Sequence, residues 1–533
     1  MLSACSDIDS VGNKHDNKAT HEAVQQILYY GGDIITMDGD RPEYVEAVVQ
    51  SEGEIVHVGD KADAIEKFPT AEKRDLKGKT MLPGFLDPHG HFMSAILMVK
   101  QVNVAAPPVG AATSIPQIIK KLKIYQQENN VAEGQWLVGW GYDQDLIDEK
   151  RHITKNDLDT AFPNHKVLII HVSMHGAILN SLALKWAGID ESTETPAGGI
   201  IARLPGTNDP AGLLMEMAYV PVLERLPEPS EAEMLELMKP AQMMYASEGY
   251  TQAIEGFTHT KHLDFLMKAA KQNKNIIDII SLPAFTEMDR WFNNSKYKFG
   301  EYNNKFKIQA CKITLDGSPQ GKTALVTTPY LTGGPAGEKD WYGNASITQQ
   351  QLDSITKKMF DANIPLQIHT NGDGAIDMMI KTVERAGITA KDDRRTIIVH
   401  SQFQRPEHLP KYVELGLLPS YFTLHTFFWG DVHVKNIGKD AAYYISPMKD
   451  AKAAGIITSN HSDFNVTPLN PFFIMWSAMA RESRSGEIIG PDQRVDAYTA
   501  LQALTTGPAY QFFEENRKGK IKTGLLADFV IIE

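Results

Sequence analysis

Short apolar runs that end in polar residues recur along the second half of this chain, and they restrict its fold more than any other feature. Helical patterns separate several of them, as where Leu352, Ile355, Met359 and Phe360 follow one face of an amphipathic segment. Strands that alternate with helices predict an α/β fold with a parallel sheet. We place eight such strands, which predicts a (β/α)8 TIM barrel, at residues 81–87, 250–255, 276–281, 307–314, 364–369, 396–400, 417–421 and 455–459.

The first predicted strand runs into two histidines separated by one residue, in the sequence Leu82-Pro83-Gly84-Phe85-Leu86-Asp87-Pro88-His89-Gly90-His91. In an extended chain, side chains at i and i+2 point the same way. His89 and His91 therefore present two imidazoles to one point, which suits a divalent transition metal. Two histidines close together are more often surface or core residues, so the assignment depends on the residues that accompany them.

Further polar residues stand where other predicted strands end, and barrel enzymes keep their chemistry at those ends. Each has an ordinary alternative: the histidines as core imidazoles, the lysine as an ion-paired strand residue, the aspartate as a turn former. Together they predict a metal site if the barrel closes. The candidate ligands are His89, His91, Lys312, His369, His400 and Asp463.

These motifs resemble those of the metal-dependent amidohydrolase superfamily, in which both histidines of the first strand bind metal. The matching segments are Leu82–His91, Cys311–Ser318, Gln367–Asp373, Ile398–Gln402 and Ser459–Asp463, although relatives often have glycine at the position of His461. Segments 139–143, 171–176, 180–184 and 198–200 resemble the amidohydrolase-3 branch. That branch contains N-substituted formamide deformylases and relatives described as exoenzyme regulators.

The resemblance implies two divalent metal ions, zinc more than iron or manganese, held by the four histidines and Asp463. It also implies that Lys312 is carboxylated and bridges the metals. This is chemically reasonable, because burial lowers a lysine pKa and the neutral amine can capture carbon dioxide. Asp463 would take a proton from the attacking water and pass it to the leaving nitrogen. Substrate contacts are expected from Trp140, His175, Asp316 and His461.

The expected activity is hydrolysis of an amide-type, non-peptide C–N bond by metal-activated water. A deaminase or another hydrolase of the same superfamily is the alternative, because the fold does not determine which bond is cleaved. Aromatic residues in the insertion and around Phe422–Trp429 weakly indicate an apolar substrate. A catalytically silent regulatory or binding protein is the third alternative, but such a protein is expected to have lost ligands that are all present here.

The domain organisation follows from strand-like segments at both ends of the chain, which resemble the small β-sandwich that flanks the barrel in this superfamily. We expect a flexible tail at 1–24 and a β-sandwich from 25–80 plus 517–533. The barrel domain would span 81–516. It would carry an insertion at about 92–248, because a simple strand–helix unit needs far fewer residues.

Composition restricts the partners that this chain can have. The net charge of −13 argues against a nucleic-acid partner, so the expected partner is a small-molecule substrate. The chain could also form a homodimer. No stretch approaches the roughly 20 apolar residues of a membrane span, and the 2 cysteines predict no disulfide framework. Leu2-Ser3-Ala4-Cys5 resembles a bacterial lipobox without the usual upstream regions. We therefore expect a periplasmic lipoprotein, with a cytoplasmic protein as the alternative.

Overall fold

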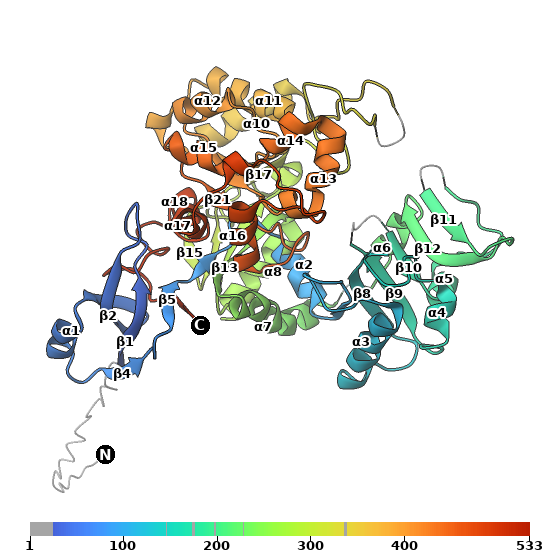
Figure 1. The fold of residues 1–533 in the computed structure, drawn as a ribbon, viewed down its shortest axis with the longest axis horizontal. Helices are drawn as coiled ribbons and strands as arrows, with labels where there is room; N and C mark the ends of the chain where they lie inside the picture. The colour runs from blue at the N-terminus through green and yellow to red at the C-terminus, as the bar shows by residue number, and fades with distance from the viewer. Residues whose placement is uncertain (1–24, 145, 173–175, 197–198, 228, 335–337) are drawn as a thin grey trace, which may run out of the picture. The chain divides into compact units, whose positions relative to one another are not determined.

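The structure is a computed structural model that describes residues 25–533 apart from 145, 173–175, 197–198, 228 and 335–337. The lipobox-like segment and His175 therefore lie outside the described residues. The fold is mixed α/β and divides into two compact units, one of residues up to Pro83 together with Lys520–Glu533 and one of Gly84–Gly519 (Figure 1). None of the described helices is both long enough and apolar enough to span a bilayer.

The first unit is built on a six-stranded sheet in the order β22-β5-β1-β2-β3, with β4 paired to β1. Alternate residues of β2 face opposite sides, as strand geometry requires. Val48 packs with Ile34 and Ile521 on one side, and Val49 packs with Ala64 of the following helix on the other. The elements are β1 (Gln26–Ile35), β2 (Tyr44–Ser51), β3 (Glu54–Gly59), α1 (Lys61–Lys67), β4 (Glu72–Asp75), β5 (Thr80–Pro83) and β22 (Phe529–Ile532).

Residues from both ends of the chain share this sheet. β22 runs antiparallel to β5, with Phe529 opposite Pro83 and Ile532 opposite Thr80. Just before β22, the amide of Ile55 donates to the carbonyl of Leu525 at 2.8 Å. The described residues of this unit form one sheet, so the second layer of a sandwich stays a proposal.

Parallel strands form the centre of the second unit, and every predicted run overlaps at least one of them. One sheet pairs β6 (Phe85–Leu86), β13 (Tyr250–Thr258), β14 (Asp278–Pro283) and β16 (Phe306–Ile308) in that order, and β15 (Tyr302–Asn303) joins its edge. The other pairs β17 (Cys311–Thr314), β18 (Leu366–Thr370), β19 (Ile397–His400), β20 (Leu418–Tyr421) and β21 (Ser459–Asn460). Isolated parallel bridges add Ala284–Lys312 and Gly90–Phe464.

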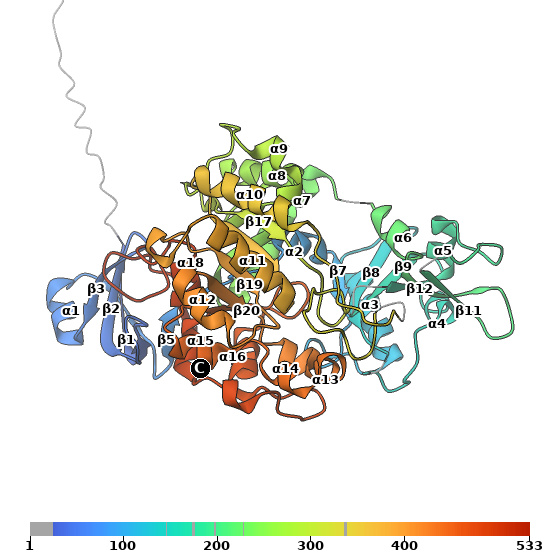
Figure 2. The same ribbon diagram turned by 90° about the horizontal axis from the view of Figure 1, so that it is seen from above.

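The helices between these strands begin where the sequence places their signals. Thr348 accepts the amide of Gln351 and the Gln351 side chain returns to the backbone of Thr348, which caps α10 (Gln349–Asp361). Its apolar face buries Leu352, Met359 and Phe360, as predicted. α11 (Asp373–Arg385) packs between α10 and α12 (His408–Leu415) (Figure 2).

The predicted insertion contains a six-stranded sheet of its own, in the order β11-β12-β10-β9-β8-β7. Alternating residues of β9 feed two apolar clusters: Val167 and Ile169 pack with Leu122 of α3, and Leu168 and Ile170 pack with Leu184 of α5. Its elements include β7 (Gln101–Asn103), α3 (Ile115–Glu128), β8 (Trp136–Tyr142), β9 (Lys166–His171), β10 (Gly176–Leu179), α5 (Ser181–Ala187), β11 (Gly199–Arg203) and β12 (Pro210–Glu216).

Candidate metal centre

His89 and His91 follow directly on β6, and backbone contacts fix both residues. The amide of His89 donates to Oδ1 of Asp87 at 3.3 Å, and the amide of His91 donates to the carbonyl of Phe464 at 2.6 Å. A bridge to Glu255 at the other side holds His91 against β13. The two ring centroids lie 5.5 Å apart, so the extended segment presents both imidazoles together, as the sequence predicts.

Asp463, just past β21, lies at the point where three histidines converge. Its Oδ1 is 3.4 Å from Nε2 of His89 and 3.3 Å from Nε2 of His91. Its Oδ2 is 4.0 Å from Nε2 of His400. Potential ligand atoms of His89, His400 and Asp463 all lie within 4.8 Å of one another. This spacing allows one cation to contact all three residues.

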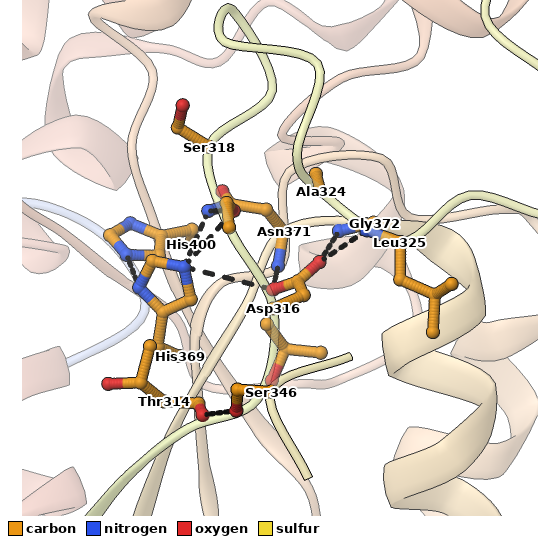
Figure 3. A network of polar contacts seen from close by, with 12 residues as sticks. Thr314, Asp316, Ser318, Ala324, Leu325, Ser346, His369, Asn371, Gly372 and His400 are labelled. Carbon is orange, nitrogen blue, oxygen red and sulfur yellow. Dashed lines mark hydrogen bonds and ion pairs between the residues drawn. The ribbon is translucent and has the colours of Figure 1, made fainter. Parts of the chain in front are cut away.

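His369 and His400 end neighbouring strands, β18 and β19, and face each other. Nδ1 of His369 is 3.0 Å from Nε2 of His400 (Figure 3). The other nitrogen of His369 faces the carbonyl of Gly317 at 3.3 Å and the side-chain amide of Asn371 at 2.9 Å. One nitrogen of His369 is therefore occupied by protein groups, while the other is directed toward His400.

Lys312, on β17, completes the group. Its Nζ lies 3.4 Å from Nε2 of His89, and the residue is 2% exposed. Burial lowers the pKa of Lys312 to about 7, although the Asp463 carboxylate opposes the shift. A substantial fraction of the amine is thus neutral near neutral pH.

The imidazoles are held mostly in the neutral form that metal ligands require. Burial lowers the pKa values of His89 and His400 well below their usual range, and it lowers that of His369 to about 4. His91 is different: burial disfavours its charged form, but the Asp463 carboxylate more than offsets this and its pKa is raised.

Asp463 also supports a cation at this point. Among the described residues, its Oδ1 belongs to the buried side-chain atoms that have no hydrogen-bond partner. A buried carboxylate oxygen without a hydrogen bond is costly, and a divalent cation held by the imidazoles 3.3 and 3.4 Å away would stabilise it. Neutral imidazole nitrogens with a carboxylate oxygen are also a common ligand set for zinc.

Three of the residues expected to contact the substrate, His461, Trp140 and Asp316, lie in different parts of the second unit. His461 is fully buried, with its ring centroid 5.1 Å from that of His89 and 5.0 Å from that of His400. Neither of its ring nitrogens makes a hydrogen bond within the described part of the chain. Trp140 lies on β8 and packs against a core cluster of the insertion. Asp316 is buried beside His369, with both oxygens bonded to backbone amides.

Glu255 and Asn371 were not among the predicted site residues. Nδ2 of Asn371 lies 2.9 Å from Nε2 of His369 and donates to the carbonyl of Gly317. Oε2 of Glu255 accepts the amide of Met93 at 2.7 Å, which holds the start of α2 (Phe92–Met98) behind His91. Their positions in the sequence could have indicated them. Glu255 is a polar residue at the end of a predicted strand, and Asn371 stands two residues after His369, where an extended chain returns to the same side.

The sequence matches a known protein family over most of its length. A model of the amidohydrolase family matches residues 72–533. The chain belongs to the amidohydrolase family. This confirms the resemblance seen in the strand-end motifs. The match extends past β22, so the family region includes the C-terminal strand of the first unit.

Individual relatives of this amidohydrolase match over nearly the whole chain. YtcJ of Bacillus subtilis (strain 168) is 28% identical over 535 residues, which cover 95% of this chain and 94% of YtcJ. N-substituted formamide deformylase of Arthrobacter pascens is 25% identical over 522 residues, 96% of this chain and 94% of that enzyme. The crystal structure of an uncharacterized metal-dependent hydrolase from Pyrococcus horikoshii OT3 has a TM-score of 0.74 at 21% identity, covering 95% of this chain and 97% of that chain. At that identity the structural match shows a shared fold.

Proposed function

We propose that this amidohydrolase uses metal-activated water to cleave an amide-type C–N bond outside peptides. One observation carries the proposal: His89, His91 and His400 converge on the carboxylate of Asp463, with Lys312 beside His89 and His369 beside His400. Consecutive parallel strands and the bridges Ala284–Lys312 and Gly90–Phe464 support a closed (β/α)8 barrel around them. The sheet shared by both chain ends supports a flanking β-sandwich domain.

The residues that would hold two divalent ions, preferably zinc, are His89, His91, His369, His400, Asp463 and Lys312 as a carbamate. Bound there, the ions would lower the pKa of a water molecule and polarise the substrate carbonyl. The carbamate proposal rests on the lowered pKa of Lys312, because a neutral amine is the form that attacks carbon dioxide.

Asp463 is suited to move a proton in this reaction. Burial alone would raise its pKa, but His91, together with His461 and Lys312, more than offsets burial and holds the pKa below the usual value. The group is therefore a carboxylate near neutral pH and can accept a proton. It would take that proton from the attacking water and deliver it to the leaving nitrogen.

An apolar group on the substrate is favoured by the surroundings of His461 and His400. The ring centroid of Phe422 lies 4.8 Å from that of His461 and 6.2 Å from that of Trp429. These rings continue from the centre into α13 (His425–Ile437), which also carries Phe427 and Phe428. The relative named N-substituted formamide deformylase acts, by its name, on amides with a substituted nitrogen, which agrees with this class.

A deaminase or a hydrolase of another bond is the rival activity, and a silent regulatory protein is a third alternative that the complete ligand set disfavours. A screen of metal-loaded protein separates them. N-formyl and N-acyl amines should release acid and amine, whereas a deaminase would release ammonia from amino-substituted heterocycles. Metal-loaded protein that turns over only the second group would overturn the amide proposal, and protein that binds no metal would overturn the hydrolase proposal.

A further inference from the structure

Asp316 follows β17 and is turned away from solvent, with a side chain that is 0% exposed. Its two oxygens accept three backbone amides: Oδ1 accepts Asn371 at 2.9 Å, and Oδ2 accepts Gly372 at 2.7 Å and Leu325 at 3.0 Å (Figure 3). The same Oδ1 lies 3.7 Å from Nε2 of His369. One carboxylate thus contacts the end of β18, the start of α11 and the loop between β17 and α10.

The surroundings of His369 fix the position of its ring. Nε2 lies 3.3 Å from the carbonyl of Gly317 and 3.7 Å from Oδ1 of Asp316. The side-chain NH2 group of Asn371 lies 2.9 Å from the same Nε2 and donates to the carbonyl of Gly317 at 2.9 Å. The backbone amide of Asn371 donates to Oδ1 of Asp316, so Asp316 holds in place the residue that contacts His369.

Asp316 also anchors the loop that follows it, which is described at residues 317–334 and 338–346. The loop leaves β17 at Asp316 and returns beside it, because Asp316 forms a bridge with Ala345. Between these points the Leu325 backbone approaches so closely that a Cβ on Gly372 would lie 1.8 Å from its carbonyl oxygen. The position of this loop and the orientation of His369 are therefore fixed by the same carboxylate.

We infer that Asp316 is a positioning residue for metal binding, which acts through Asn371 and the orientation of His369 and joins the loop that follows β17 to the metal centre. The inference rests on the proposed function, since it takes His369 and His400 as metal ligands. Partners that orient a ligating histidine in this way typically contribute about 10–100-fold to metal affinity.

The test compares Asp316→Asn with Asp373→Asn. Asp373 anchors the same loop, since Oδ1 accepts the amide of Thr327 at 2.9 Å and Oδ2 accepts its hydroxyl, but it does not contact His369. Each purified full-length protein would be equilibrated with zinc and a competing chelator, and its metal content measured. Cobalt-loaded samples would give a visible spectrum that reports the ligand geometry.

Asp316→Asn should weaken binding of one of two ions about 10–100-fold and alter the cobalt spectrum, while Asp373→Asn should bind both ions like the wild type. If Asp316→Asn does not fold, Asn371→Ala removes the contact with His369 and should show the same loss of one ion. Equal metal binding by wild type and Asp316→Asn (or Asn371→Ala, if that variant is used) would overturn the inference alone. So would equal losses in Asp316→Asn and Asp373→Asn. A wild-type protein without metal affinity would overturn the proposed function as well.

Discussion

The ammonium nitrogen of Lys312 lies 3.4 Å from Nε2 of His89, and both residues are almost fully buried. Two basic nitrogens at this distance in a poorly solvated site cannot both be protonated without strong repulsion. Burial, followed by Lys312, lowers the pKa of His89 well below its usual range. The site therefore favours a neutral or anionic form of Lys312 over the protonated amine, and a carbamate is an anionic form.

Replacing Lys312 should remove metal without unfolding the chain. In Lys312→Ala the proposed bridging oxygens are lost, so metal content after purification should fall to a small fraction of the wild-type value. Short carboxylic acids should restore part of it by supplying those oxygens. Elemental analysis with and without added acid measures this, and circular dichroism controls for folding. A variant that keeps the full wild-type metal content without added acid would contradict the bridging role.

Asp463→Asn separates proton transfer from metal binding. Asparagine keeps the shape and one oxygen, so much of the metal should stay, whereas turnover should fall by about 10²–10⁴, the range of general acid–base groups. The measurements are metal content and kcat on an amide found in the screen. Unchanged kcat in a variant with normal metal content would exclude Asp463 as the proton carrier.

Removing the metal should lower thermal stability. An ion that binds the folded chain stabilises it by about 4 kcal/mol at 1,000 times its Kd. Prolonged treatment with a strong chelator should therefore lower Tm by several degrees, and zinc should restore it. Calorimetry on treated, untreated and reloaded samples measures the effect. Identical Tm values in samples shown to differ in metal content would argue against a site inside the folded core.

A second buried ionic group gives a pH-dependent prediction. The Asp278 carboxylate accepts a hydrogen bond from the Lys518 ammonium at 2.7 Å and another from Arg517. The hydroxyl of Tyr302 also donates to it, at 3.3 Å. Burial would raise its pKa, but Lys518 and Arg517 more than offset this and the pKa is lowered from 3.8. A lowered folded-state pKa adds stability that is complete above the unfolded value and is lost as pH falls through the folded value.

Asp278→Asn should therefore cost about 3 kcal/mol at pH 7, because it leaves the buried Lys518 ammonium and the half-buried Arg517 without this carboxylate. The difference from wild type should shrink below about pH 4, where the carboxyl of the unfolded chain begins to bind protons, and should vanish below the lowered pKa of the folded state. Urea unfolding from pH 3 to pH 7 measures both stabilities. A difference that is constant over this range would show that the ion pairs do not cause it.

The last strand should be needed for solubility. Deleting residues 529–533 removes β22 from one side of β5 and exposes backbone donors and acceptors along that edge. The soluble fraction and Tm should both fall. Ile531→Lys is the control, because Ile531 is 44% exposed and this change keeps the backbone pairing. Equal solubility of the deletion and the control would show that β22 is dispensable.

The sequence predicts well those features that depend on local patterns. A strand such as 364–369 is recognisable because its apolar run and its terminal His369 are adjacent in the chain, and β18 forms there. The capping of α10 by Thr348 is equally local. The sheet of the insertion was not predicted, because its strand order depends on pairing between distant segments such as β10 and β12. The contacts of Asp316 were also invisible, since its partners are backbone amides, which every residue carries.

The sheet of the first unit takes strands from both sides of Gly84–Gly519, and this has a consequence for biosynthesis. β5 leaves the ribosome long before β22, and at about 5–20 residues per second the interval lasts on the order of tens of seconds. During that time the edge of β5 has no strand to pair with, although residues that form the metal centre are already being translated. The nascent chain thus carries an open strand edge until residues 529–532 emerge, and this interval is where a chaperone would have most effect on yield.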